Sequence, residues 1–152
     1  MRLALFQPDI PQNLGAAMRL SACFDIVLEV IEPCAFPVSD KSLKRAALDY
    51  APQARILRHD GWSAFLGHEA RKEGRLVLFT TRGAVRLEAA GLLPGDTLLF
   101  GRESAGVPDF VYQASELAVK IPISPRARSL NLSVSAGIAL FEGLRGCGAL
   151  PQ

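Results

Sequence analysis

Long hydrophobic runs are absent from this sequence of 152 residues. A transmembrane helix needs about 20 consecutive apolar residues, and no stretch of the chain approaches that length. The opening residues, MRLALFQPDIPQ, contain too short an apolar stretch for a signal peptide and no small-residue cleavage pattern. They predict a first strand instead, and we expect a cytoplasmic protein that does not enter a membrane.

Cysteine and histidine are scarce, with three and two residues. Cys23, Cys34 and Cys147 lack the spacing of metal ligands, and any pairing would leave one thiol over. The sequence has neither an HExxH motif nor an acidic cluster typical of a metal site. We therefore expect no metal centre, and we interpret the cysteines as small apolar residues.

The common phosphate-binding glycine loops are missing too, because neither GxGxxG nor GxxxxGKS/T occurs. The net charge of +2 does not by itself predict a nucleic-acid-binding protein. Of the 17 basic residues, however, 13 are Arg, which binds phosphate through two donors and stacks on bases. The local concentrations at Lys41–Arg45 and Arg126–Arg128 are, taken alone, better explained as a solvated charged face.

The composition that is present is that of a globular domain, with 49% apolar and 21% charged residues. The length predicts a single domain over residues 1–152. Strand-like runs alternate with helical patterns, which favours an α/β fold with a mostly parallel sheet flanked by helices. Runs such as LVLF and TLLF are continuously apolar, as expected of strands covered on both faces.

Expected strands cover Arg2–Phe6, Ile26–Ile31, Arg55–Leu57, Leu76–Phe79, Thr97–Phe100 and Leu117–Ile123. Expected helices run from an Asn13 cap to Cys23, from an Asp40 cap through Ala47, and over Gly61–Lys72, Pro108–Ala114 and Asn131–Arg145. In such folds ligands bind beyond the carboxyl ends of the strands. We therefore expect the site in the loops that follow the first strand, LVLF, TLLF and the last strand.

The loop after the first strand, P-Q-N-L-G-A-A-M-R (11–19), contains a potential helix cap and an arginine. Asn13 would cap the helix, Gly15 would let a ligand approach, and Arg19 lies near the helix start. A helix N-terminus beside a guanidinium suits a phosphate or a developing negative charge. A capped helix with a surface arginine explains the same residues.

The stretch G-R-E-S-A-G (101–106) resembles the nucleophile elbow of hydrolases only in part. Arg102 stands where the elbow has its first glycine, and His59 and His68 both precede Ser104, contrary to the elbow's chain order. The two glycines permit an open backbone that could wrap a flat ligand, although an ordinary strand-to-helix turn accounts for them as well.

The third loop, I-P-I-S-P-R-A-R-S-L-N-L-S (121–133), is held extended by its prolines. Ser129 or Asn131 would cap the final helix. Small residues follow, which allow another element to approach closely: Ser133, Ala136, Gly137 and Ala139. A rigid loop that leads into a tightly packed helix is the plainer interpretation.

The order and spacing of N-L-G-A-A-M-R, F-G-R-E-S-A-G-V-P and the third loop resemble the three motifs of the SPOUT-class RNA 2′-O-methyltransferases. The resemblance runs nearly end to end. The segment D-K-S-L-K-R-A-A-L-D-Y (40–50) and the small size resemble the tRNA wobble-position enzymes of this class, which methylate the 2′-hydroxyl of cytidine or uridine at position 34. The resemblance implies an α/β domain with a deep carboxyl-terminal trefoil knot, which holds S-adenosylmethionine.

The resemblance also implies the cofactor residues. They should surround S-adenosylmethionine largely through backbone groups, and they are Phe79, Gly101, Ile121, Ser129 and Leu130. In this interpretation Ser104 is no nucleophile, and Glu103 anchors the loops rather than acting as a base.

Arg19 corresponds to the family's catalytic arginine. It would either assist deprotonation of the ribose hydroxyl together with a substrate phosphate, or stabilise the emerging alkoxide. The resemblance implies a homodimer in which Arg19 of one subunit faces the cofactor of the other. The expected partner is a tRNA anticodon stem-loop, contacted by Lys44, Arg45 and Arg128 through phosphates and by Tyr50 through base stacking.

Two alternatives remain open from the sequence. One is a sister enzyme of this class that methylates another tRNA position or ribosomal RNA. The other is a noncatalytic RNA-binding or assembly protein of the same fold.

Overall fold

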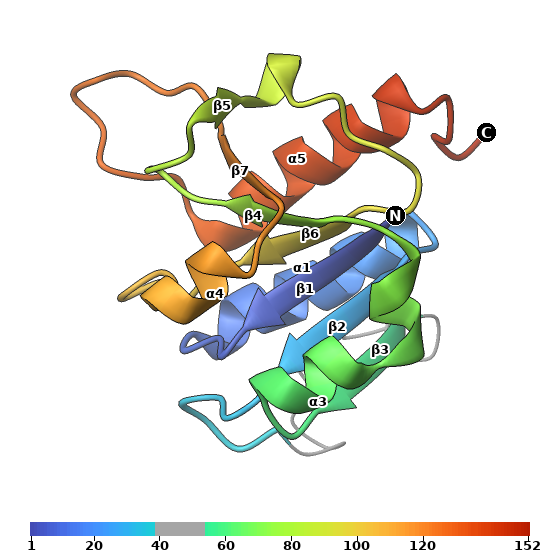
Figure 1. Cartoon of the computed structure of the whole chain (residues 1–152), viewed down its shortest axis with the longest axis vertical. Coiled ribbons are helices and arrows are strands. Elements are labelled where there is room, and N and C mark those ends of the chain that lie inside the picture. The colour runs from blue at the N-terminus through green and yellow to red at the C-terminus, as the bar shows by residue number, and fades with distance from the viewer. Residues whose placement is uncertain (39–53) are drawn as a thin grey trace.

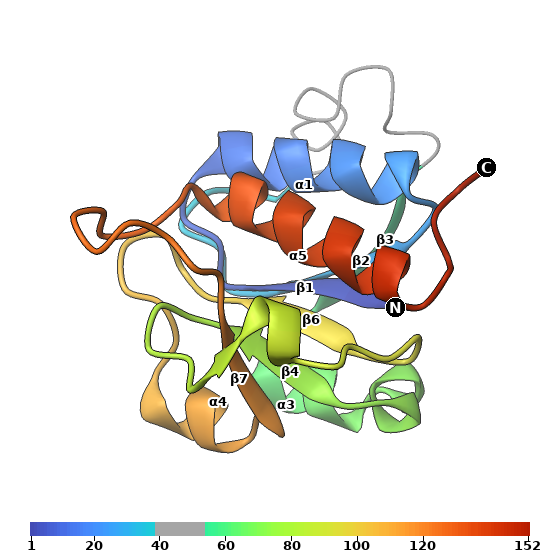
Figure 2. The same ribbon diagram turned by 90° about the horizontal axis from the view of Figure 1, so that it is seen from above.

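The computed structural model describes residues 1–38 and 54–152, which form a parallel sheet between two layers of helices (Figures 1 and 2). The strands are β1 (Arg2–Phe6), β2 (Val27–Ile31), β3 (Arg55–His59), β4 (Leu76–Phe79), β5 (Val85–Arg86), β6 (Thr97–Phe100) and β7 (Leu117–Lys120). Their order in the sheet is β3-β2-β1-β6-β4-β7-β5, and every neighbouring pair is parallel. The predicted α/β fold with a mostly parallel sheet is confirmed.

The helices divide between the two faces of the sheet (Figure 2). The long helices α1 (Pro11–Cys23) and α5 (Leu132–Gly146) lie side by side on one face. The other face carries α3 (Trp62–Gly67) and α4 (Asp109–Gln113). Two short 3-10 turns complete the set, η2 (Glu69–Glu73) and η3 (Leu87–Ala89).

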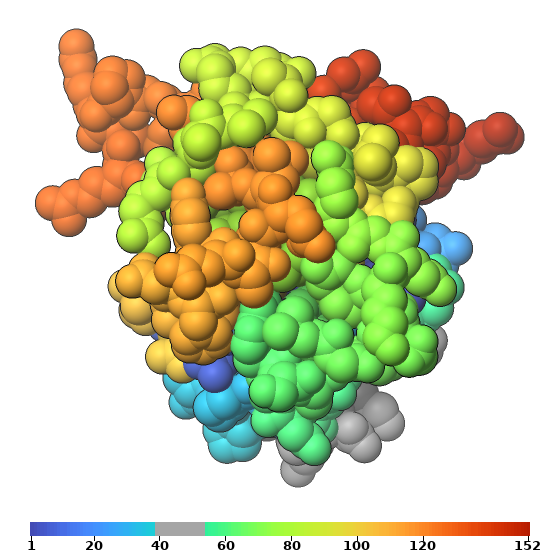
Figure 3. Space-filling model, in the orientation of Figure 1, coloured from blue at the N-terminus to red at the C-terminus, as the bar shows by residue number. Residues whose placement is uncertain are grey.

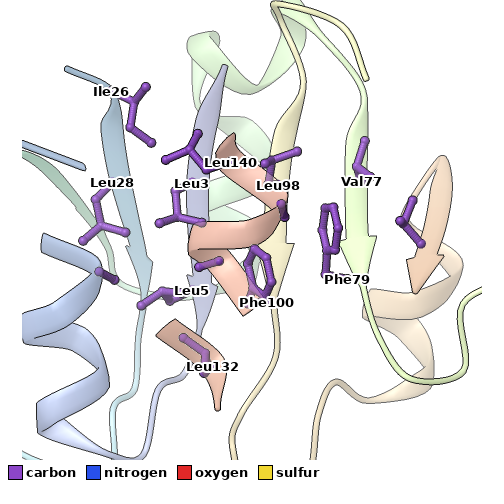
Figure 4. Packing of buried hydrophobic residues seen from close by; sticks show 14 of the residues in the cluster. Leu3, Leu5, Ile26, Leu28, Val77, Phe79, Leu98, Phe100, Leu132 and Leu140 are labelled. Carbon is purple, nitrogen blue, oxygen red and sulfur yellow. The ribbon is translucent and has the colours of Figure 1, made fainter. Parts of the chain in front are cut away.

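The core consists of one apolar cluster on each face, which explains why the strand sequences are apolar throughout. Leu3 and Leu5 of β1 pack toward α1 and α5, whereas Ala4 and Phe6 pack toward α3 and α4. Figure 4 shows the larger cluster, with side chains of neighbouring strands meeting α5 through Leu140. Each fully buried leucine contributes about 1.5–3 kcal/mol relative to exposure, so the sheet is stabilised from both sides.

Most expected elements are present, and the differences have local causes. The helix expected over Gly61–Lys72 is split, because His68 adopts an extended conformation and its Nδ1 accepts a hydrogen bond from the Ala70 N–H at 3.3 Å, which starts η2. The last strand ends at Lys120 rather than Ile123, since Pro122 has no N–H to donate to a neighbouring strand. The two-residue strand β5 was not expected. The helix predicted after Asp40 lies outside the described residues.

The strand order places late segments of the chain between earlier ones. Strand β7 lies between β4 and β5, and β6 lies between β1 and β4. The loop after β4 passes close to β7 at Gly83, where a Cβ atom would lie 2.4 Å from the carbonyl carbon of Val119, so only glycine fits. The carboxyl ends of β4, β6 and β7 are thereby gathered at one edge of the sheet. The trefoil knot implied by the resemblance stays a prediction.

Candidate active site

A cavity of about 450 Å³ opens at this edge, between the ends of β4, β6 and β7 and the start of α5. Its volume lies within the range of about 300–1,000 Å³ that is usual for pockets that bind small molecules. Four separate segments of the chain supply its walls, within residues 10–13, 78–81, 100–107 and 121–135. All five residues expected around the cofactor line it, namely Phe79, Gly101, Ile121, Ser129 and Leu130.

The cavity has an apolar floor and a polar rim. The rings of Phe79 and Phe100 stack with their centroids 5.0 Å apart and their planes 12° apart, and Figure 4 shows them at the ends of neighbouring strands. Polar side chains stand around this floor, among them Thr80, Asn131 and Ser135. The arrangement suits a ligand that combines a flat apolar ring with polar groups.

The second motif forms one wall as a closed turn. The Arg102 N–H donates to the Gly106 carbonyl at 2.9 Å, and the Gly106 N–H donates back to the Arg102 carbonyl at 2.8 Å. Gly106 has φ +68°, a conformation that favours glycine. A Cβ atom on Gly101 would lie 2.5 Å from the Gly106 carbonyl carbon. Both glycines are therefore required by the shape of the wall.

A chain of hydrogen bonds ties the three motif loops together. Glu103 Oε2 accepts from the Asp9 N–H at 3.0 Å, and Oε1 accepts from Asn13 Nδ2 at 2.8 Å. Asn13 Oδ1 accepts from Asn131 Nδ2 at 2.9 Å. Asn131 in turn caps α5, since its Oδ1 accepts from the Ser133 N–H at 2.9 Å. Glu103 is thus a loop anchor, as expected from the sequence.

The predicted cap at Asn13 is wrong, although the predicted helix exists. Helix α1 begins at Pro11, with Ile10 at the N-cap position and no side-chain cap. Proline suits this first position because its missing N–H needs no partner there. Asn13 therefore lies inside the helix, 5% exposed, and its side chain serves the loop network instead. Sequence reasoning also missed Asp9, whose partners lie 94 and 95 residues away.

The paired carboxylates of this network have opposite pKa shifts. The Glu103 side chain, the Ser104 hydroxyl and the backbone N–H groups of both residues hold the pKa of Asp9 at about 2. Burial, followed by the nearby Asp9, raises the pKa of Glu103 above its usual range. Asp9 therefore ionises at a lower pH than Glu103.

Ser104 has the surroundings of a loop residue and not those of a nucleophile. Its hydroxyl donates to the carboxylate of Asp9. The two histidines lie beside α3, where His59 Nε2 contacts Glu29 Oε2 at 2.7 Å and the His59 ring packs against His68. The structure therefore brings neither histidine to Ser104, which agrees with the rejection of the hydrolase elbow.

Arg19 and Arg128 are not among the residues that line the cavity. Arg19 lies on the exposed side of α1, six residues after Asn13, which is about 9 Å along the helix axis. Arg128 is exposed in the segment that follows Ile121 and projects from the body of the molecule (Figures 1 and 3). The predicted RNA contacts Lys44, Arg45 and Tyr50 lie outside the described residues.

Comparison with known proteins identifies the family of this fold. The profile of the SpoU rRNA Methylase family matches residues 1–141. The chain belongs to the SpoU methylase family. Membership fits a cavity built from the three motif loops, because these loops carry the resemblance to RNA 2′-O-methyltransferases.

Individual members of the SpoU family are similar over nearly the whole chain. A tRNA (cytidine(34)-2′-O)-methyltransferase of Beijerinckia indica subsp. indica is 45% identical over 150 residues, which is 99% of this chain and 94% of the relative. A solved structure from a study of 2-OH methylation of C/U34 on tRNA has a TM-score of 0.88 and 42% identity, and covers 95% of this chain and 94% of that one. An AdoMet-bound rRNA methyltransferase from Sinorhizobium meliloti has a TM-score of 0.83 and 26% identity, over 95% of this chain and 55% of that one.

Two negative findings concern the described residues 1–38 and 54–152. No group of three His, Cys, Asp or Glu side chains is placed to hold a metal ion. No helix in these ranges is long and apolar enough to cross a membrane.

Proposed function

We propose that this SpoU-family protein transfers a methyl group from S-adenosylmethionine (AdoMet) to the ribose 2′-hydroxyl of the cytidine or uridine at position 34 of tRNA. The observation that carries the proposal is the convergence of five predicted cofactor residues, from three distant segments, on one cavity. The relatives named for this reaction match the chain along almost its full length. Because tRNA is the substrate, we expect the enzyme in the cytoplasm.

The cavity fits AdoMet in its chemistry. The stacked rings of Phe79 and Phe100 offer an apolar floor for an adenine ring. Ser129 and the backbone of the segment around Leu130 stand at the rim, where the polar ribose and amino-acid groups would lie. When bound, AdoMet supplies a methyl group on a positively charged sulfonium sulfur. The side chains of the protein then have to hold the ribose oxygen in line and balance its charge.

Arg19 is the proposed catalytic residue. Free arginine has a pKa above about 12, so its guanidinium stays charged and is suited to stabilise an emerging alkoxide or to position a phosphate. Its distance from the cavity of its own subunit is accounted for if it serves the cavity of a second subunit. In that arrangement Arg19 contacts the reacting nucleotide from the side opposite the cofactor.

The α1/α5 layer is the proposed dimer surface. Val134, Ile138 and Phe141 follow one another along α5 at helical spacing and are 50%, 39% and 49% exposed. Such a stripe of large apolar side chains is typical of a buried interface. Arg19 stands on the neighbouring helix of the same layer (Figure 2), so pairing through this layer brings it toward the partner. The small residues Ala136 and Ala139 pack inward into the core instead.

Three basic residues and one tyrosine are proposed to hold the tRNA. Arg128 belongs to the segment between Ile121 and Leu132, which projects from the body of the molecule (Figure 3). Its proposed contact is a phosphate of the anticodon stem-loop. Lys44, Arg45 and Tyr50 complete the proposed set, with the lysine and arginine on phosphates and the tyrosine stacked on a base.

The proposal is tested by methyl transfer from labelled AdoMet to tRNA that lacks the wobble methyl group, with the modified nucleotide mapped. We expect label on the ribose of position 34. Label on a different nucleotide would show that the enzyme methylates another RNA position. No label on any RNA would refute the activity. We expect Arg19→Ala to abolish turnover while AdoMet binding is retained. Arg55→Ala is the matched control, because Arg55 is also exposed but lies at the amino end of the edge strand β3.

A further inference from the structure

Three aromatic rings from different elements meet at the carboxyl edge of the sheet, on the α3/α4 layer. Phe6 ends β1, Trp62 begins α3, and Phe110 lies in the first turn of α4. The Trp62 ring centroid is 5.8 Å from that of Phe6 and 6.3 Å from that of Phe110. Phe6 is 3% exposed, whereas Phe110 is 54% exposed. The cluster therefore has a buried base and an outer ring that is open to solvent.

This aromatic cluster is continuous with the cavity. Arg102 lines the cavity, and its guanidinium donates to the side chain of Gln7, the residue that follows Phe6. On the other side, Val107 lines the cavity and α4 begins two residues later. Val107 also belongs to the same apolar cluster as Phe6 and Trp62, so the aromatic rings adjoin the wall of the cavity.

We propose that Trp62 and Phe110 form a stacking surface for an unpaired nucleobase of the bound RNA, outside the AdoMet cavity. The inference rests on the proposed function, because it takes RNA to be the substrate. Bases stack on exposed aromatic rings regardless of their identity, since every base has a flat π-face. The base held here belongs to a nucleotide that flanks the one whose ribose is methylated.

The size and position of the cluster favour a base over a protein partner. A stable protein interface buries about 800 Å² on each side, and two partly covered rings of about 150–250 Å² each supply far less. The apolar stripe suited to a second copy, Val134 to Phe141 on α5, lies on the opposite face of the sheet (Figure 2). Asp60 and Asp109 adjoin the two rings in the sequence, so stacking and not net positive charge holds the ligand here.

The single tryptophan of the chain makes the contact directly measurable, because all indole fluorescence comes from Trp62. The probe is a 17-nucleotide anticodon stem-loop RNA, titrated at constant salt. Polyphosphate of similar charge is the control ligand, since it has phosphates but no bases. We expect the RNA to quench Trp62 and polyphosphate to leave its fluorescence unchanged.

The matched variants are Phe110→Leu, which keeps an apolar side chain, and Phe110→Tyr, which keeps the ring. The stacking energy usual for one base predicts that Phe110→Leu weakens RNA binding about 5- to 150-fold and that Phe110→Tyr binds like the wild type. Phe110→Leu should leave the salt dependence unchanged, whereas Arg128→Ala should lower its slope by about one. Thermal melts and AdoMet binding equal to the wild type show that the variants are folded.

Three results would overturn the inference. They are equal quenching by polyphosphate, equal RNA affinity of the leucine and tyrosine variants, and a fluorescence change driven by protein concentration alone, which would place a second copy on this face. Methylation mapping of the wild type separates this test from the proposed function. RNA binding that depends on Phe110, without methyl transfer, would support the stacking surface and refute the proposed activity. Methylation at position 34 with no effect of Phe110→Leu would support the activity and refute the stacking surface.

Discussion

Replacing Asn13 with alanine tests whether the loop network holds the cavity together. The Asn13 side chain makes two hydrogen bonds, one to the Glu103 carboxyl at 2.8 Å and one from Asn131 at 2.9 Å. A hydrogen bond to a charged group contributes about 1.5–3 kcal/mol and a neutral one about 0.5–1.5 kcal/mol. Alanine has a better helix propensity than asparagine, and this offsets the loss by up to about 0.7 kcal/mol. The expected loss in the free energy of unfolding is therefore about 1.3–4.5 kcal/mol.

This loss has a measurable size in a domain of 152 residues. It corresponds to a decrease in Tm of about 3–18 °C, because 1 kcal/mol shifts a domain of this size by about 2–4 °C. Circular dichroism melts measure the shift, and calorimetric titration with AdoMet should show weaker binding, since Asn13 also lines the cavity. Gln12→Ala is the control, because Gln12 is exposed on the same turn of α1.

The reasoning would be refuted by an Asn13→Ala variant that melts and binds AdoMet like Gln12→Ala. The double variant Asn13→Ala/Asn131→Ala gives a second check. Both residues belong to one network, so the combined loss should be smaller than the sum of the two single losses. Additive losses would mean that the two asparagines act independently.

Three further predictions concern the site and the proposed dimer surface. Gly101→Ala should weaken AdoMet binding at least about tenfold in calorimetry, because its Cβ would force the Gly106 backbone, 2.5 Å away, to move on the order of 1 Å; wild-type affinity would contradict this. The stability that Asp9 adds through its lowered pKa is present above its ordinary pKa of 3.8 and is lost as the pH falls to about 2. The gap in urea midpoint between the wild type and Asp9→Asn should shrink over that range, and a constant gap would argue against the shift. Ile138→Glu should give a monomer in sedimentation, with methyl transfer lost; a fully active dimer would place the interface elsewhere.

The sequence predicted the central strands well because their signals are local. LVLF and TLLF are short apolar runs bounded by polar residues and glycine, and they became β4 and β6 with the expected bounds. Strand β5 had no such signal, because its two residues are held by pairing with β7, Val85 beside Val119 and Arg86 beside Lys120. The position of β6 between β1 and β4 likewise depends on contacts between distant segments.

The sequence predicted the cavity residues better than the hydrogen-bond network around them, because only the cavity residues have a local signal in the chain. Gly101 and Ser129 were found because each sits in a motif whose order along the chain is distinctive, and Phe79 because it ends the apolar run LVLF. The links between those motifs were missed, because Asn13 meets Glu103 across 90 residues and Asn131 across 118. Hydrogen bonds at such separations leave no local pattern. Asn13 as a helix cap was the natural expectation, and the tertiary contacts overrode it.

The order of the strands has a consequence for how the molecule is made. The walls of the cavity come from residues 10–13, 78–81, 100–107 and 121–135. Strand β1 gains its second neighbour in the sheet only when β6 has been made. During synthesis, at about 5–20 residues per second, the amino-terminal half is complete several seconds before α5 emerges. The cofactor site is therefore incomplete in a nascent chain, and AdoMet binds only molecules in which α5 has packed against the sheet. Ligand binding in this protein is a property of the finished fold and stabilises only chains that have reached it.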